Sequence, residues 1–98
     1  MDVVFRAQAL ADLRTVMAWY RDQGDSSEAR IDAAFEEELA YMRRVPFGYQ
    51  VRRSPYRFAM IEGYTYFIIY AVVKETLVIH RIRHMRQRPL KRYFGSGV

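Results

Sequence analysis

The first residues of the chain alternate between polar and apolar side chains, and the spacing of the apolar residues then changes. Val3 and Phe5 fall on one face of an extended segment, which predicts a short strand over residues 2–6. From residue 7 the apolar residues recur at intervals of three and four, which is typical of an amphipathic helix; they are Leu10, Leu13, Val16, Met17 and Tyr20. We expect this helix to end near Gly24, because glycine commonly follows the last helical residue.

A second helix is predicted directly after this turn. Residues 25–28, Asp-Ser-Ser-Glu, offer a capping side chain followed by an early acid, and both favour a helix N-terminus. The next apolar residues again have helical spacing; they are Ile31, Phe35, Leu39 and Met42. Pro46 is expected to end the helix, because its ring disfavours a helical conformation at the preceding residue.

After Pro46 the helical period gives way to short runs of aromatic and β-branched residues. We expect an extended segment at 49–53, a strand at 57–61, and a two-residue hairpin turn at Glu62-Gly63. Residues 64–73 are apolar on both faces, as in a central strand, and after a turn at 74–75 a last strand is predicted over 76–83. The order β-α-α-β-β-β predicts an α+β fold in which a two-helix hairpin covers one face of a small sheet.

Length and composition narrow the class of protein. A chain of 98 residues predicts one domain over residues 1–98, with residues 90–98 expected to form a flexible basic tail. The sequence contains no cysteine, no apolar leader and no apolar run near the roughly 20 residues that span a bilayer. It also lacks a glycine-rich phosphate loop, and two histidines make a poor zinc site. We expect a cytoplasmic protein without membrane contact, cofactor or metal.

Charge is divided unevenly along the chain. The net charge is +5, but residues 1–48 hold six arginines and nine acids, for −3, whereas residues 49–98 hold ten lysines and arginines and two acids, for +8. Such asymmetry favours a polyanionic partner for the second half, either nucleic acid or an acidic protein segment. The alternative is that the basic surface only aids solubility.

Most of this positive charge follows the last predicted strand. Both histidines lie here among the cations: His80, Arg81, Arg83, His84, Arg86, Arg88, Lys91 and Arg92. On simple alternation, Leu77, Ile79, Arg81 and Arg83 share one face, and Val78, His80, Ile82 and His84 share the other. Arg81 and His84 would then point to opposite sides unless a bulge intervenes, which weakens any site that needs both. We interpret His80 as a histidine at the edge of the core and His84 as an orienting contact at the end of the strand.

Several short motifs, taken in order, resemble a known family. They are Asp12-Leu13 in the first helix, Arg57 two residues after Pro55, Gly63-Tyr64 before the central strand, Ile69-Tyr70, and the strand ending IRHMRQ. Together they resemble the RelE/ParE superfamily of toxins from bacterial type II toxin–antitoxin modules, over residues 3–89. The resemblance implies a curved, mainly antiparallel sheet. It also implies a hetero-oligomer with a cognate antitoxin, which wraps the toxin with a helix and an extended segment.

The superfamily contains two activities, and the fold does not decide between them. RelE-like members cut messenger RNA in the ribosome, which requires a base, an acid and cations around the phosphate. A site of that kind would use His84, Arg57 and Tyr93 as catalytic residues, yet the strand YRFAMI lacks the paired lysines expected in it. ParE-like members inhibit DNA gyrase and are not known as nucleases.

A histidine followed by basic residues at the end of the last strand resembles ParE more than RelE. Arginine and aromatic residues are favoured at interface centres, and positive charge complements an acidic antitoxin or gyrase surface. The predicted target-binding or antitoxin-binding residues are Arg81, Arg83, Arg86, Arg88, Lys91, Arg92 and, on the first helix, Trp19. We therefore expect a toxin that binds DNA gyrase. The alternatives are a ribosome-dependent mRNA endoribonuclease, which alone would be an enzyme, and a non-toxic basic binding module.

Overall fold

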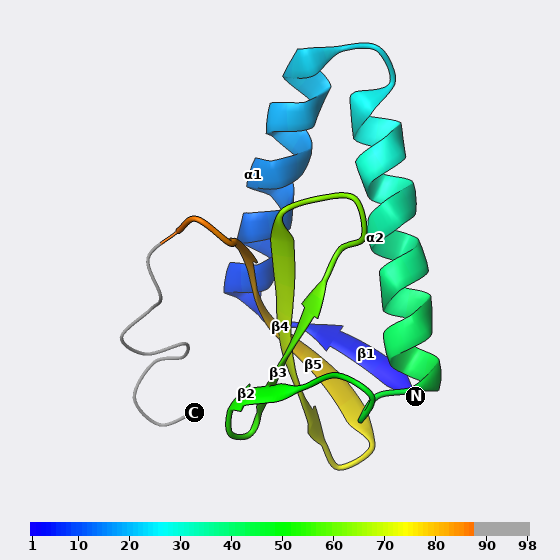
Figure 1. Cartoon of the computed structure of the whole chain (residues 1–98), viewed down its shortest axis with the longest axis vertical. Coiled ribbons are helices and arrows are strands. Elements are labelled where there is room, and N and C mark those ends of the chain that lie inside the picture. The colour runs from blue at the N-terminus through cyan, green and yellow to red at the C-terminus, as the bar shows by residue number, and fades with distance from the viewer. Residues whose placement is uncertain (88–98) are drawn as a thin grey trace.

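Two helices and five strands make up residues 1–87, which are the residues that the computed structural model describes (Figure 1). In chain order the elements are β1 (Asp2–Phe5), α1 (Ala7–Gln23), α2 (Ser27–Arg44), β2 (Val51–Arg53), β3 (Tyr56–Met60), β4 (Tyr66–Val73) and β5 (Thr76–His84). The predicted α+β fold is confirmed, with the segment expected to be merely extended forming the short strand β2. The predicted tail over residues 90–98 lies outside the described residues.

The strands form one mixed sheet in the order β1-β5-β4-β3-β2. The first strand pairs parallel with the last, and the other neighbouring strands pair antiparallel. The helices α1 and α2 form the hairpin that connects β1 to the rest of the sheet (Figure 1). The end of β5 therefore lies beside the beginning of α1, although about 70 residues separate them in the sequence.

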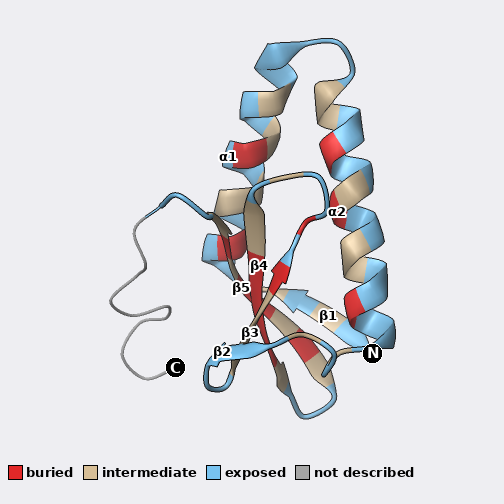
Figure 2. Cartoon of the chain, viewed as in Figure 1, coloured by how far each residue is buried: buried red, intermediate tan, exposed pale blue. Residues whose placement is uncertain are grey.

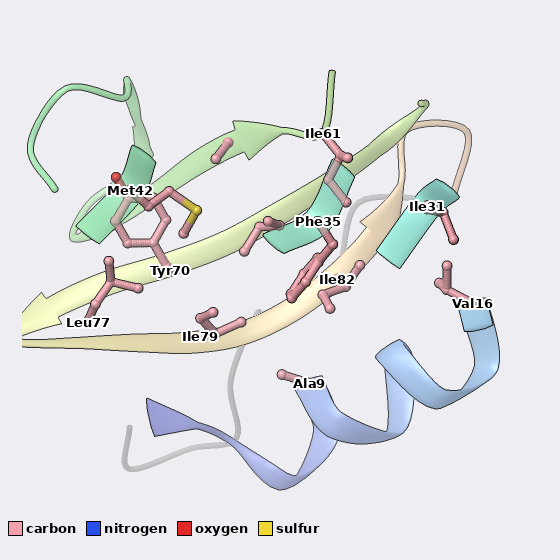
Figure 3. Close-up of a cluster of buried hydrophobic side chains, with 12 residues drawn as sticks. Ala9, Val16, Ile31, Phe35, Met42, Ile61, Tyr70, Leu77, Ile79 and Ile82 are labelled. Atoms are coloured by element: carbon pink, nitrogen blue, oxygen red, sulfur yellow. The ribbon is translucent and has the colours of Figure 1, made fainter. Parts of the chain in front are cut away.

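The core lies between the helix hairpin and one face of the sheet (Figures 2 and 3). The helix α2 contributes the predicted residues Ile31, Phe35 and Met42, all buried. On α1 the predicted pattern is wrong at its start, because Leu10 is 37% exposed and Ala9 is fully buried. The small side chain of alanine lets the first turn of α1 approach the sheet closely, so the buried face begins one residue earlier than hydrophobicity alone indicates.

The two hairpin turns fall where glycine and polar residues predict them. The amide of Tyr64 donates to the carbonyl of Ile61 at 3.0 Å, which places Glu62 and Gly63 at the centre of the turn. Gly63 has a φ of 82°, a left-handed conformation that suits glycine. The loop is longer than predicted, however, since β4 begins only at Tyr66.

A β-bulge interrupts the last strand at His80. Ile69 pairs with Arg81 whereas Tyr70 pairs with Ile79, so His80 is the extra residue on β5. The predicted sharing of one face by Leu77, Ile79, Arg81 and Arg83 is therefore wrong: Ile82, not Arg81, continues the buried face begun by Leu77 and Ile79. The bulge moves the end of β5 into a new register with respect to α1.

Within residues 1–87, neither α1 nor α2 is long and apolar enough to cross a membrane.

Candidate binding site at the end of the last strand

An ion pair between α1 and β5 organises the strand end. The guanidinium of Arg81 donates to both carboxylate oxygens of Asp12, from Nε to Oδ2 at 2.8 Å and from a terminal nitrogen to Oδ1 at 3.1 Å. The backbone amide of Ile82 donates to the same Oδ2 at 2.9 Å. The two side chains are only 17% and 18% exposed. Bidentate pairing of this kind is directional and strong, so Arg81, a predicted binding residue, is engaged within the chain.

Asp12 also accepts a backbone hydrogen bond that a neighbouring strand would otherwise accept. The pairing of β1 with β5 stops at Phe5 and Ile79, with one further bond from the amide of Arg6 to the carbonyl of Ile79. Beyond that point the amide of Ile82 has no strand beside it on this side, and the carboxylate of Asp12 accepts its hydrogen bond instead. The motif in the first helix and the motif at the end of the last strand thus form one structural unit.

Both ring nitrogens of His84 have hydrogen-bond partners. The amide of Arg86 donates to Nδ1 at 3.0 Å, and Nε2 lies 2.7 Å from Oγ1 of Thr65. Because a backbone amide can only donate, the hydrogen-bond network places the proton of the neutral ring on Nε2. The lone pair of Nδ1 is already used, so no ring nitrogen is available as a general base. His84 fixes the turn after β5, in agreement with an orienting contact.

We predict that His84→Ala leaves growth inhibition largely intact. The substitution removes two hydrogen bonds and should lower the free energy of unfolding by about 1–2 kcal/mol, measured by urea denaturation. Thr65→Val, which removes one of the same bonds, serves as the matched control and should cost less stability. This interpretation would be contradicted if His84→Ala lost growth inhibition at an unchanged protein level while Thr65→Val remained toxic.

Arg57 lies at the other end of the helix-covered face. Its guanidinium donates to the carbonyl of Tyr49 at 2.6 Å and of Phe47 at 3.2 Å, and so holds the segment between α2 and β2. Arg57 pairs with Tyr70 of β4, whereas His84 pairs with Tyr66. This offset of four residues corresponds to about 13 Å along the strand.

The three candidate catalytic residues are therefore not brought together in the described chain. Arg57 and His84 come from strands on opposite sides of β4, and each makes hydrogen bonds to other parts of the chain. The third candidate, Tyr93, lies outside the described residues. Among residues 1–87, no group of three or more histidine, cysteine or acidic side chains is placed to hold a metal ion.

A groove connects the strand end to the exposed tryptophan of α1. Trp19 is 55% exposed and packs edge-on against Tyr20, with ring centroids 4.8 Å apart. The hollow beside it has a volume of about 290 Å³ and is lined by residues of α1, β4 and the end of β5, including Asp12, Trp19, Tyr66, Ile82, His84 and Gln87. An exposed aromatic residue next to a half-open groove is characteristic of a protein-binding surface.

The described part of the chain contains four of the predicted binding residues. Trp19 lines the groove, Arg81 supports it, Arg83 is half-buried on β5, and Arg86 is exposed just after the strand. The remaining predicted cations, Arg88, Lys91 and Arg92, lie outside the described residues. Sequence reasoning missed Tyr66, whose ring packs edge-on against His84 at 5.1 Å.

His80 is buried on the opposite face of the sheet from the groove-lining His84. It is 3% exposed, and its ring lies 5.1 Å from that of Tyr56. Burial, helped by the positive charge of Arg6, lowers the pKa of His80 to about 4. His80 is buried, as predicted, but it lies on the other face of the sheet from the core cluster and not at its edge; the ring is neutral at pH 7.

We predict that His80 makes folding sensitive to mild acid. Its folded pKa lies below the unfolded value of about 6.5, so the unfolded state binds the proton more readily. The contribution of the neutral His80 ring to the free energy of unfolding is complete above about pH 6.5. It is lost as pH falls towards 4, which lowers the free energy of unfolding by on the order of 2 kcal/mol. Urea denaturation at several pH values should show this loss, and His80→Phe should reduce it. An equal pH dependence in both proteins would contradict the assignment.

The chain is similar both to a family model and to a solved structure. Residues 3–89 match the model of a family described as the ParE toxin of type II toxin-antitoxin system, parDE. A solved structure described as the chromosomal ParDE TA system from P. aeruginosa superimposes with a TM-score of 0.75 and 18% sequence identity, covering 88% of this chain and 97% of that chain. No curated protein sequence matches the chain significantly.

Proposed function

Since this chain belongs to the ParE toxin family of type II toxin–antitoxin systems, we propose that it stops growth by binding and inhibiting DNA gyrase and that a cognate antitoxin neutralises it. The proposal rests on which side chains at the end of β5 are held within the chain and which are exposed. Arg81 and His84 are held by internal hydrogen bonds, whereas Trp19 and Arg86 remain exposed beside them. Such an arrangement favours a preformed binding edge over a catalytic one.

The proposed contact has an apolar centre and a charged border. Trp19 and the groove beside it would supply an anchor that becomes buried on binding, because tryptophan is among the residues that contribute most at interface centres. Arg86 and the cations that follow it in the sequence attract an acidic surface and set the rate of encounter. The antitoxin would cover the same edge in a hetero-oligomer. A toxin that binds an antitoxin and DNA gyrase would act in the cytoplasm.

The alternative, a RelE-like endoribonuclease, has less support. Its two described candidates, Arg57 and His84, lie far apart and already have hydrogen-bond partners. The cations on β3 that such a site needs are reduced to the single Arg57. A non-toxic binding module would keep the same edge without a target, and it would neither inhibit gyrase nor stop growth.

A gyrase assay with the purified chain tests the proposal directly. We expect the toxin to abolish supercoiling of relaxed plasmid by gyrase, and Trp19→Ala to raise the concentration needed by at least about tenfold, as for a central interface residue. Tyr41→Ala is the matched control, because Tyr41 is also an exposed helical aromatic residue but lies on α2. Full supercoiling at saturating toxin would overturn the proposal.

A further inference from the structure

A second hollow lies along α2, away from the strand end. It has a volume of about 680 Å³ and is formed by one side of α2, by Tyr49 before β2, and by Glu62 in the turn between β3 and β4. The side chains that give it its character are Glu37, Glu38, Tyr41, Arg44, Tyr49 and Glu62. Nothing in the proposed gyrase contact uses this groove.

The groove is negatively charged on a protein that is positive overall. Three carboxylates and one guanidinium line it, whereas the chain carries a net charge of +5. The hydroxyl of Tyr49 donates to the carboxylate of Glu38, and burial together with this bond raises the pKa of Tyr49. Glu37 and Glu62 are exposed to solvent. A ligand in the groove would therefore meet two accessible carboxylates beside an aromatic wall.

The aromatic wall already holds a cation. The guanidinium of Arg44 lies 5.6 Å from the ring centroid of Tyr41, which is 44% exposed. Tyr41 packs edge-on against Tyr49 at 5.7 Å, and Tyr49 packs edge-on against the buried Tyr70 at 6.2 Å. The row of rings is thus anchored in the core and presents an aromatic face of the kind that attracts arginine and lysine.

The chain itself contains a segment with the complementary chemistry. From Arg81 to the C-terminus there is no acidic residue, and residues 86–92, RQRPLKR, carry four cations around one leucine. We propose that these residues of a second copy of the chain dock into the α2 groove. Their cations would face Glu37 and Glu62, and Leu90 would contact the tyrosines.

The geometry makes this contact a head-to-tail one. The strand β5 ends beside α1 (Figure 1), whereas the groove lies along α2, so each copy offers one groove and one basic segment. A contact between two different surfaces is heterologous and can extend from copy to copy. Because it depends on charge and is small, it should be weak and sensitive to salt. If the proposed function holds, self-association also occupies the cations that would meet gyrase.

Light scattering of the purified full chain tests the proposal. We expect the average mass to rise with concentration at about 0.01 M salt and to return to that of the monomer at about 1 M, where charges are screened within about 3 Å. Glu37→Gln/Glu62→Gln should remain monomeric at low salt. Asp32→Asn/Glu36→Gln, with the same charge change at exposed α2 positions outside the groove, should associate like the wild type.

A mixing experiment identifies the head-to-tail arrangement. A second variant, Arg88→Gln/Lys91→Gln/Arg92→Gln, keeps the groove and loses the basic segment. Each variant alone should be monomeric, whereas their equimolar mixture should form dimers and nothing larger, because only one intact groove and one intact segment remain per pair. A monomeric wild type at low salt, or a mixture that stays monomeric, would overturn the proposal.

A peptide experiment gives a readout that does not depend on assembly. The synthetic peptide of residues 85–94, MRQRPLKRYF, should bind the full chain at low salt in a calorimetric titration and bind Glu37→Gln/Glu62→Gln at least tenfold more weakly. Equal affinity for both proteins would exclude the α2 groove as the binding site. The groove variant should still inhibit growth, which separates this proposal from the gyrase proposal.

Discussion

Replacing Asp12 with alanine is expected to lower the free energy of unfolding by about 2–4 kcal/mol, the largest effect on stability that we predict for a single substitution. The substitution leaves the mostly buried guanidinium of Arg81 and the amide of Ile82 without their shared acceptor. Losing one partner of a desolvated ion pair costs more than the pair itself contributes, because the remaining charge stays buried.

Thermal unfolding should show this effect clearly. For a domain of this size, a loss of about 2–4 kcal/mol lowers the Tm by roughly 10–20 °C. Asp12→Asn keeps an acceptor for the amide of Ile82 and should lose less, whereas Asp22→Ala, an exposed position at the end of the same helix, should change little. Arg81→Ala should be destabilising as well, and the double variant should be less destabilised than the sum of the two. A Tm change of only a few degrees for Asp12→Ala would contradict the assigned role.

Neutralising the cations after β5 is expected to remove most growth inhibition, the largest functional effect that we predict. Arg88→Gln/Arg92→Gln halves the positive charge of residues 86–92 and weakens attraction to an acidic target. The folded domain should remain, because the ion pair, the bulge and the contacts of His84 all lie within residues 1–87.

Growth after induction of equal amounts of each variant measures this effect. Arg14→Gln/Arg30→Gln is the matched control, because it removes the same charge from exposed positions on the two helices. We expect the control to stop growth like the wild type and Arg88→Gln/Arg92→Gln to allow colonies to form. Unchanged toxicity in the latter would show that the basic segment does not contact the target.

Local sequence signals predicted the elements well, because their ends depend on neighbouring residues. The helix α1 ends at Gln23, just before Gly24 with its φ of 72°, and α2 ends at Arg44, two residues before Pro46. The predicted cap of α2 is a different matter. Ser26 adopts a left-handed conformation and makes no capping hydrogen bond with its side chain, so its side chain does not explain where the helix begins.

The site could be predicted only in part, because its geometry depends on contacts between distant residues. Periodicity cannot reveal the bulge at His80, which shifts the end of β5 to the register in which Asp12 accepts the amide of Ile82. The sequence placed Asp12 in a helix motif and Arg81 among the cations of the last strand, and only the structure shows that they pair. Trp19 was predicted as a binding residue and is exposed, but the groove beside it includes Tyr66, which the sequence presents as an ordinary strand residue.

A short pulse of expression in bacteria without antitoxin, with DNA breaks and transcript ends mapped in the same culture, distinguishes gyrase inhibition from RNA cleavage most directly. A toxin that binds gyrase predicts arrested, filamentous cells with broken DNA and intact messages. His84→Ala should give the same pattern. Messages cut at codon-related positions with intact DNA would contradict gyrase inhibition and assign the strand end to RNA cleavage.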